Sequence, residues 1–405
     1  MTMAATLVFN RSTLFPYGQW LPDLDGELRV LTMKDWADPT GRAIVERFAS
    51  FDTQGLAELR VAELAAREPI RTVFGHSEYD LLRAARLREH LGLPGQRADS
   101  VRAYRNKALM KTLAGAAGIP VPAFRALETA VDLLDFIAEH AFPVVVKPVD
   151  GGGSRGVQVL RDREALARFL ERWPERPYMV ERFVAGDMLH IDGLAIDGQL
   201  RFGAASRYLH GCLAFQHGRS LGSVLLDPST ALARRALAFA GQVMAALPAS
   251  PLVAFHLEAF VTPDDRLMLC EIASRTGGAK IVETLHHALG VQLNRAWVRA
   301  AVGLDPELAP RPAPGPYAGW LVIPPRRGVL TAVPPAPPAA WCVDFDVPHA
   351  PGAALSTAVA SVDHVAMMVV EGRSPDEVER RLHELDAWFA SETRWTEPGD
   401  VGDAA

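Results

Sequence analysis

Two acidic residues face each other in a hairpin predicted past the middle of the chain. Apolar and polar residues alternate on both sides of Asp264 and Asp265 in the run LVAFHLEAFVTPDDRLMLCEIA. A turn centred there places Glu258 directly opposite Glu271, on one face of the sheet. Two opposed carboxylates repel each other, and a divalent cation removes that repulsion; their hard oxygen atoms suit Mg²⁺. The alternatives are a slipped register and an exposed acidic pair near Arg266.

An arginine and a glycine turn follow the second of these carboxylates. Arg275 lies four residues after Glu271, and Gly277 and Gly278 open a loop before the next predicted helix. Arginine binds phosphate or carboxylate groups with two parallel hydrogen bonds, and the N–H groups of a glycine turn at a helix start favour anions. We therefore predict that these three residues contact a substrate. A surface salt bridge is the alternative for Arg275.

Three more polar side chains are candidates for substrate contact. His256 lies two residues before Glu258 on the same strand face, so it is expected to face the same site; a purely structural role is the alternative. His217 and Arg219 belong to the polar segment Arg207–Ser223, which precedes the predicted hairpin that carries Glu258. We expect this segment to line the acceptor site, with an exposed polar loop as the alternative.

A second glycine-rich run follows a strand that carries a lysine. Lys147 precedes the run GGGSRG, which contains Gly152, Gly153 and Ser154. The run also fits G-x-G-x-x-G, but a dinucleotide site needs a helix after the glycines, and the strand-like VQVL follows here. A dinucleotide-dependent enzyme is therefore rejected. A glycine loop between antiparallel strands can donate N–H groups to phosphates beside Lys147, and a plain glycine hairpin with a surface lysine is the alternative.

Seven segments occur in an order that resembles the ATP-grasp superfamily, in the branch that holds bacterial L-amino-acid ligases and carbamoyl-phosphate-synthase-like proteins. Within Arg105 to Gly303 these segments are RNKALMK, GIPVP, VVVKP, GGGSRGV, ERFVAGD, FHLEAF and CEIASRTGG. The upstream run EYDLLRAARLREHLGLPG resembles the domain that precedes the grasp in this family.

The resemblance implies where a nucleotide binds. Two lysines would contact the ATP phosphates under the closing glycine loop, namely Lys107 and Lys147. Adenine would be held largely through the backbone of a strand that ends in Glu181, Phe183 and Val184. Asp187 would accept hydrogen bonds from the ribose.

The resemblance also implies a metal and a substrate site. Glu258 and Glu271 would bind Mg²⁺, and Arg275 would hold the substrate carboxylate or its acylphosphate. Ala273 stands where the family commonly has a metal-binding Asn, so one Mg²⁺ is expected and a second is left open. Asn106, on a predicted helix from Ser100 through Leu113, stands where the family often has Asp.

The elements that position these residues predict an α/β fold with a small α+β unit, and the resemblance implies an ATP-grasp fold with an α+β lid and an N-terminal Rossmann-like pre-grasp domain. Short β-rich runs alternate with helical stretches over the first part of the chain. The expected parts are an N-terminal pre-grasp domain (1–100), a small lid subdomain (101–185), a large subdomain with the metal site (186–304), a C-terminal α/β piece completing it (305–390) and a disordered tail (391–405).

The composition and net charge limit the kinds of molecule that this protein is expected to bind. A net charge of −6 gives no electrostatic reason to expect nucleic acid or an anionic membrane, and no run approaches the ~20 apolar residues of a spanning helix. Three widely spaced cysteines and the lack of a signal-peptide pattern predict a cytoplasmic protein. We expect small-molecule carboxylate and amine substrates, and a homodimer is left open.

The resemblance implies an ATP-dependent carboxylate–amine ligase that forms an amide or peptide bond through an acylphosphate, with an amino-acid-like substrate. Two other functions stay open. One is an ATP-dependent carboxylase or carbamoyl-phosphate-type enzyme, although no biotinyl or glutaminase segment is recognised. The other is a non-catalytic ATP-binding regulator, against which the intact acidic, arginine and lysine positions argue.

Overall fold

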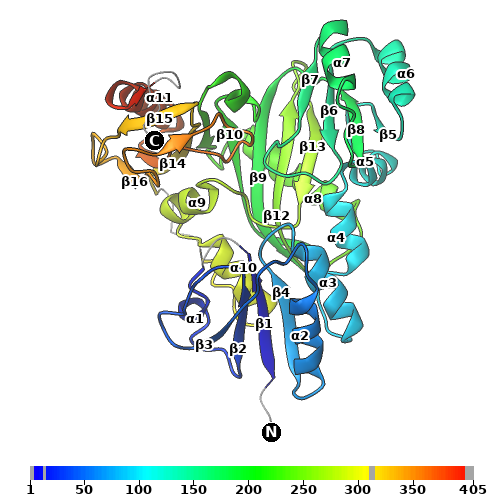
Figure 1. Cartoon of the computed structure of the whole chain (residues 1–405), viewed down its shortest axis with the longest axis vertical. Coiled ribbons are helices and arrows are strands. Elements are labelled where there is room, and N and C mark those ends of the chain that lie inside the picture. Colours follow the sequence, from blue (N-terminus) through cyan, green and yellow to red (C-terminus); the bar gives the residue numbers. More distant parts are fainter. Residues whose placement is uncertain (1–3, 12–14, 310–314, 397–405) are drawn as a thin grey trace, which may run out of the picture.

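The computed structural model describes residues 4–11, 15–309 and 315–396, and its strands group into four sheets (Figure 1). The N-terminal sheet is parallel, with the order β3-β2-β1-β4, and its strands are β1 (Ala5–Asn10), β2 (Leu28–Thr32), β3 (Ala43–Arg47) and β4 (Ile70–Gly75). The accompanying helices are α1 (Tyr17–Trp20), α2 (Leu56–Ala65) and α3 (Leu81–His90). This strand order reverses between β1 and β4, and ligands of open α/β sheets bind at the carboxyl ends of strands at such a point.

The second unit is a small antiparallel sheet with the order β5-β8-β6-β7. Its strands are β5 (Phe124–Leu127), β6 (Val144–Pro148), β7 (Gln158–Leu160) and β8 (Tyr178–Arg182). Two helices pack on it, α6 (Ala130–His140) and α7 (Arg163–Leu170), through a core that includes Leu133, Phe136 and Phe169. This unit stands at the upper right of Figure 1.

An antiparallel sheet of eight strands forms the centre of the molecule, with the order β13-β12-β9-β10-β11-β14-β18-β16. Its strands are β9 (Asp187–Ile196), β10 (Gln199–Tyr208), β11 (Leu221–Leu225), β12 (Leu252–Val261), β13 (Leu267–Ala273), β14 (Tyr317–Ile323), β16 (Cys342–Asp346) and β18 (Ala366–Gly372). The helical elements of this part are η1 (Ala214–His217), α8 (Ala231–Ala245), α9 (Ile281–Leu289), α10 (Leu293–Ala301) and α11 (Pro375–Glu392).

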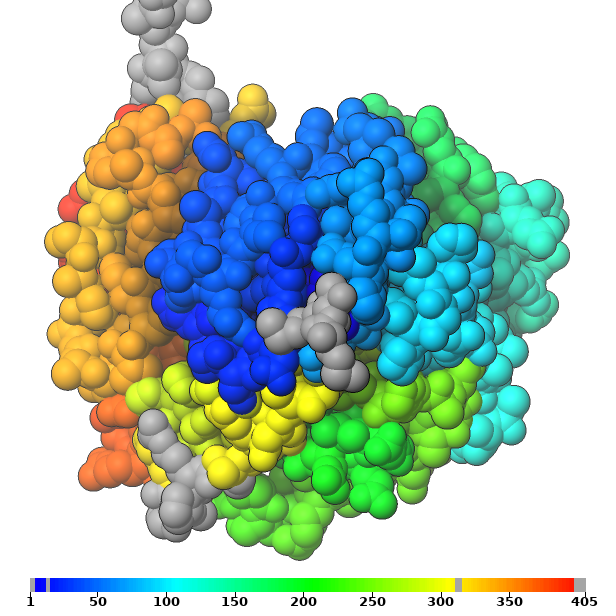
Figure 2. All heavy atoms as spheres, turned by 90° about the horizontal axis from the view of Figure 1, so that it is seen from below, coloured from blue at the N-terminus to red at the C-terminus, as the bar shows by residue number. Residues whose placement is uncertain are grey.

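One hydrophobic core joins the N-terminal sheet to this large sheet. Phe74 on β4 packs edge-on against Trp297 of α10, with ring centroids 4.7 Å apart, and the same core continues to Trp320 on β14. Seen from below, the N-terminal unit covers the middle of the molecule between the C-terminal strands and the helices of the small unit (Figure 2). The N-terminal unit is therefore fixed against the large sheet.

The predicted facing of two carboxylates on the β12–β13 hairpin is confirmed, but the turn differs from the expected one. Glu258 pairs with Glu271, whereas nearer the tip Val261 pairs with Leu267. The tip therefore holds an odd number of residues, and the register shifts by one between Glu258 and Ala259. A bulge at Cys270 absorbs this extra residue and restores the predicted register at the carboxylates.

The single helix predicted from Ser100 through Leu113 was wrong. It divides into α4 (Ala98–Arg105) and α5 (Lys107–Ala116). Asn106 lies between them in extended backbone, and its side-chain oxygen accepts hydrogen bonds from the N–H groups of Ala108 and Leu109 at 3.1 and 3.0 Å. Asn and Asp are equally good N-caps. Asn106 therefore makes the helix start that presents Lys107 as its first residue.

The predicted disordered tail was wrong for residues 391–396, and residues 397–405 lie outside the described part of the chain. Helix α11 continues to Glu392, and β19 (Arg394–Thr396) pairs with β15 (Gly328–Ala332) in a three-stranded sheet with β17 (Ala354–Leu355). Trp395 packs on the core beneath α11, and this burial explains the order. Among the described residues, no helix is long and apolar enough to cross a membrane.

Candidate functional site

The two opposed carboxylates have different surroundings. Glu258 accepts a hydrogen bond from the hydroxyl of Tyr208 at 2.9 Å and faces the Cys212 thiol at 3.4 Å. The Nε2 atom of His256 lies 3.6 Å from its Oε1 atom. Glu271 instead pairs with the ammonium group of Lys107 at 3.0 Å. The site therefore holds two carboxylates that are oriented by separate partners.

These partners keep Glu258 ionised. Burial alone would raise the pKa of Glu258, but the contacts with His256, Tyr208 and Cys212 outweigh burial and lower that pKa to about 2. Burial would likewise lower the pKa of His256, but the charge of Asp192 outweighs it and raises the pKa to about 10. The carboxylate thus carries its charge at neutral pH, which a cation ligand requires.

Two cavities meet at this carboxylate pair. One, of about 430 Å³, is lined by Lys107 and Lys147 and is here called the lysine cavity. The other, of about 470 Å³, is lined by Arg275 and Glu78 and is called the arginine cavity. The residues that line both are Ser154, Arg155, Cys212, Glu258 and Glu271. A molecule in either cavity therefore reaches the same two carboxylates.

Buried ion pairs build the wall of the lysine cavity. Lys147 on β6 contacts Glu181 on β8 at 2.6 Å, and Lys111 on α5 contacts the other carboxylate oxygen at 3.3 Å. Burial raises the pKa of Glu181, but the charges of Lys111 and Lys147 outweigh burial and lower it. The wall beyond this carboxylate is largely apolar, and it includes Phe183, Val184, Val145, Met188 and Phe260.

The glycine-rich loop connects β6 to β7 and lies between the two cavities. Gly151 lines the lysine cavity, whereas Gly152 and Gly153 line the arginine cavity. Two contacts fix the loop: the ammonium of Lys107 donates to the Gly151 carbonyl at 2.6 Å, and the Ser361 N–H donates to the Gly153 carbonyl at 2.9 Å. Gly153 has a φ of +62°, which favours glycine.

The arginine cavity draws its polar groups from distant segments. The Nε atom of Arg275 donates to Glu78 at 3.0 Å, and its Nη1 atom donates to the carbonyl of Thr276 at 2.8 Å. Glu78 follows β4 and Asn10 ends β1, so both lie at the switch point of the N-terminal sheet. Apolar lining comes from Leu221, Ile281 and Trp320, and Ala360, Ser361 and Val362 close the remaining side.

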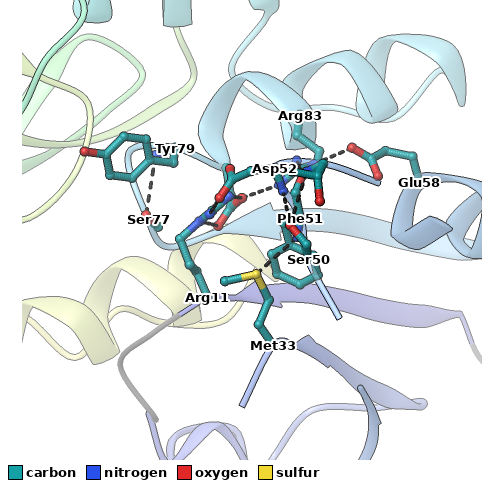
Figure 3. Close-up of polar contacts among 11 residues, drawn as sticks. Arg11, Met33, Ser50, Phe51, Asp52, Glu58, Ser77, Tyr79 and Arg83 are labelled. Atoms are coloured by element: carbon teal, nitrogen blue, oxygen red, sulfur yellow. Dashed lines mark hydrogen bonds and ion pairs between the residues drawn. The ribbon is translucent and has the colours of Figure 1, made fainter. Parts of the chain in front are cut away.

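A polar network supports this edge of the N-terminal unit (Figure 3). Arg11 donates to Asp52 at 2.5 Å and to Asp80 at 2.8 Å, and its guanidinium lies over the ring of Tyr79. Arg83 bonds Glu58 in the same network. Arg11 and Tyr79 also line the arginine cavity, so the network holds part of its wall in place.

Some predicted site residues lie elsewhere than expected. His217 and Arg219 line the lysine cavity and not the arginine cavity. His217 ends η1, where Gln216 donates to the carbonyl of Val157 at 2.8 Å. Asp187 is exposed and lies outside both sets of lining residues. Gly278 lines the arginine cavity, and Gly277 packs beneath it against Asp192 and His256.

Four site residues were missed from the sequence: Lys111, Glu78, Tyr208 and Asp192. Lys111 lies one helical turn after Lys107, and that spacing on one helix face was a usable signal. Glu78 follows a predicted strand, where ligand groups collect in parallel sheets. No local pattern singles out Tyr208 or Asp192.

Comparison with known proteins agrees with this architecture. A model of the ATP-grasp domain matches residues 112–202. This part of the chain is therefore similar to the ATP-grasp domain. The predicted ATP-grasp fold is confirmed: the crystal structure of the L-amino acid ligase from Bacillus licheniformis superposes with a TM-score of 0.75 at 17% identity, covering 97% of this chain and 99% of that one.

Two curated relatives match this chain over shorter lengths. The L-arginine-specific L-amino acid ligase of Bacillus subtilis is 24% identical over 274 residues, which is 65% of this chain and 65% of that protein. The uncharacterized protein y4rH of Sinorhizobium fredii is 37% identical over 105 residues, 24% of this chain and 22% of that protein. The chain thus spans less than two thirds of either relative.

Proposed function

We propose that this chain is an ATP-dependent ligase that joins an amino-acid-like carboxylate to an amine through an acylphosphate. The observation that carries the proposal is the meeting of two cavities at Glu258 and Glu271. One cavity has lysines suited to phosphates, and the other has an arginine suited to a carboxylate. A phosphoryl group could pass between the two ligands at the shared carboxylates.

ATP is the proposed occupant of the lysine cavity. Lys107 and Lys147 are placed to hold its phosphates, and the apolar wall formed by Phe183, Val184 and Met188 suits a planar base. Exposed His217 and Arg219 border the same cavity, where they could contact the nucleotide. Among the relatives, an N5-carboxyaminoimidazole ribonucleotide synthetase is described as an ADP complex and a carboxylase domain as a complex with MgADP.

The donor set fits Mg²⁺. Glu258 and Glu271 offer hard oxygen atoms from opposed positions, and Ala273 adds no ligand, so one ion is proposed. When bound, Mg²⁺ would offset the charge that develops on the transferred phosphoryl group. The incomplete set of protein ligands matches an ion that completes its shell with phosphate oxygens and water.

The remaining steps belong to residues of the chain. Arg275 would hold the substrate carboxylate. One oxygen of that carboxylate would attack the γ-phosphorus of ATP, and ADP would leave. The amine nitrogen then attacks the acyl carbon, phosphate leaves and the amine loses a proton. The glycine loop, fixed by Lys107 and Ser361, would keep water from the acylphosphate. Lys147 would offset charge on the phosphates throughout.

The test is ADP release in a screen of amino-acid pairs with MgATP. We expect one or more pairs to support release by the native protein, and Glu271→Ala and Arg275→Ala to lower the rate by about a thousandfold or more, as for other transition-state contacts. Arg266→Ala, at the exposed hairpin tip, is the matched control and should keep the native rate.

Other outcomes of this screen identify other functions. Release that needs bicarbonate and no amino acid would indicate a carboxylase or carbamoyl-phosphate-type enzyme. ATP binding without release under any condition would indicate a regulator. Near-native release by Glu271→Ala or Arg275→Ala would refute the proposed site.

A further inference from the structure

A chain of buried polar side chains runs beneath the carboxylate pair. Asp192 on β9 contacts two histidines, the Nδ1 atom of His190 at 2.6 Å and the Nδ1 atom of His256 at 2.9 Å. The Nε2 atom of His190 continues to the hydroxyl of Ser223 at 2.7 Å. All four side chains are buried. None of these four side chains has a direct part in the proposed reaction.

The strand register places these groups in a grid on one sheet face. Glu258 stands between Glu271 on β13 and His190 on β9, while His256 stands between Ala273 on β13 and Asp192 on β9. The methyl group of Ala273 offers His256 no hydrogen bond. Asp192 is therefore the polar partner that fixes the imidazole from the neighbouring strand.

Asp192 is a buried carboxylate whose two oxygens are both paired with histidines. Burying a carboxylate costs several kcal/mol unless its oxygens are paired, and both oxygens of Asp192 are paired. Flanking residues of β9 and β12, such as Ile191 and Leu257, belong to an apolar core. Apolar packing alone would stabilise this part of the sheet, so a buried charge here calls for a functional reason.

The same carboxylate also shapes the turn after Arg275. A Cβ atom on Gly277 would lie 2.6 Å from the Oδ1 atom of Asp192 and 3.1 Å from the Nδ1 atom of His256. The turn therefore passes directly over this pair, and only glycine fits without displacing it. Asp192 thus contacts both the residue that faces Glu258 and the loop that follows Arg275.

We infer that Asp192, acting through His256, positions Glu258 for the divalent cation. The inference rests on the proposed function, which assigns that cation to Glu258 and Glu271. Asp192 holds the Nδ1 side of the imidazole, which directs the Nε2 atom toward Glu258, 3.6 Å away. Such outer partners of metal ligands change metal affinity by about 10- to 100-fold when they are replaced.

The experiment measures metal binding without catalysis. Mn²⁺ is titrated into the full-length protein with saturating ADP, and free Mn²⁺ is followed by electron paramagnetic resonance. We expect Asp192→Asn to raise the dissociation constant of Mn²⁺ about tenfold or more. Its affinity for ADP without metal should stay within about twofold of the native value, because Asp192 lies outside both cavities.

Two variants of His256 decide the matter if Asp192→Asn does not fold. His256→Gln keeps a donor near the position of Nε2, which faces Glu258, whereas His256→Asn keeps one only near Nδ1. We expect His256→Asn to lose more Mn²⁺ affinity than His256→Gln. Asp38→Asn replaces a buried carboxylate in the N-terminal unit and is the control that should leave Mn²⁺ affinity unchanged.

The two hypotheses fail in different ways. If the native protein with ADP binds no Mn²⁺, the proposed metal site is refuted, and this inference with it. If the native protein binds Mn²⁺ and every folded Asp192 and His256 variant binds it within twofold of native, the positioning role is refuted and the proposed function stands.

Discussion

The lysine cavity and the arginine cavity share two carboxylates but are built differently. The lysine cavity comes from one continuous stretch, residues 107–271, and its central charge, Glu181, is paired inside that stretch. The arginine cavity combines Asn10 and Glu78 of the N-terminal unit with Arg275, Trp320 and the turn around Ser361. The first cavity needs two packed subdomains, whereas the second needs the whole molecule to be assembled.

This difference predicts separable failures. Changes in the wall of the lysine cavity should affect nucleotide binding, whatever the second substrate. Changes at the junctions around the arginine cavity should affect the second substrate and leave nucleotide binding intact.

The largest effect is expected from Lys147→Ala. It removes a phosphate contact and leaves Glu181 buried with Lys111 as its remaining ionic partner. We expect ADP release to fall about a thousandfold, or about 4 kcal/mol, and the free energy of unfolding to fall by about 3–5 kcal/mol. The measurements are ADP release and urea unfolding. Normal ADP release by Lys147→Ala would contradict the assignment.

The next effect concerns His76, which connects the two units behind the arginine cavity. Its Nε2 atom contacts Asn294 at 3.0 Å and its Nδ1 atom contacts Tyr17 at 3.3 Å. Burial lowers the pKa of His76 from 6.5 to about 4. Between these values the unfolded chain binds a proton that the folded protein does not, so stability is lost as the pH falls from 6.5 toward 4, by up to ~3 kcal/mol.

Urea unfolding at pH 7, 5.5 and 4.5 checks this prediction. His76→Gln should remove this share of the pH dependence, and an unchanged slope would count against it. The affinity of this variant for ADP at pH 7 should equal that of the native protein, because His76 lines the arginine cavity but not the lysine cavity.

A smaller effect is expected from Glu78→Gln, which keeps the shape of the pair with Arg275 but removes one charge. Arg275 and Glu78 meet across the junction of the two units at 3.0 Å. We expect the KM of the second substrate to rise about 10- to 100-fold, or about 1.4–2.7 kcal/mol, with the KM of ATP unchanged. Glu46→Gln, in the same unit but paired with Arg29 and Arg60 away from both cavities, is the control. An equal rise in the KM of ATP would remove the distinction between the cavities.

The smallest effect is expected from Asp363→Ala. The Asp363 carboxylate accepts hydrogen bonds from the N–H groups of Val359 and Ala360 at 2.8 and 2.9 Å, and this turn presents the Ser361 N–H to Gly153. Loss of such local bonds costs about 1 kcal/mol, so we expect kcat/KM to fall about fivefold. Asp363→Asn, which retains an acceptor, should lie closer to native in steady-state kinetics; a larger loss in Asp363→Asn would contradict this role.

Local patterns explain why the lysine cavity could be predicted from the sequence. Lys147 and the glycine loop are neighbours in sequence, and one hairpin carries Glu258 and Glu271. The helix break at Asn106 was missed because the residues on both sides have helical periodicity, although Asn is a strong N-cap.

The arginine cavity could not be predicted in the same way. Glu78 and Arg275 are 197 residues apart, and the turn at Ser361 lies farther along the chain. No periodicity or short motif records which loops meet across such separations. The sequence likewise did not indicate which cavity His217 and Arg219 would line, and in the structure they line the lysine cavity.

The bulge at Cys270 separates the geometry of the hairpin tip from that of the carboxylates. The pair nearest the tip, Val261 with Leu267, follows one register, and the pair Glu258 with Glu271 follows a register that differs by one residue. The bulged residue Cys270 takes up this difference. An insertion grafted into the exposed tip, for instance a fluorescent tag or an affinity peptide, therefore has no need to preserve the parity of the turn. The tip offers a place to attach a reporter whose length can be varied while the pairing of Glu258 with Glu271 stays as it is.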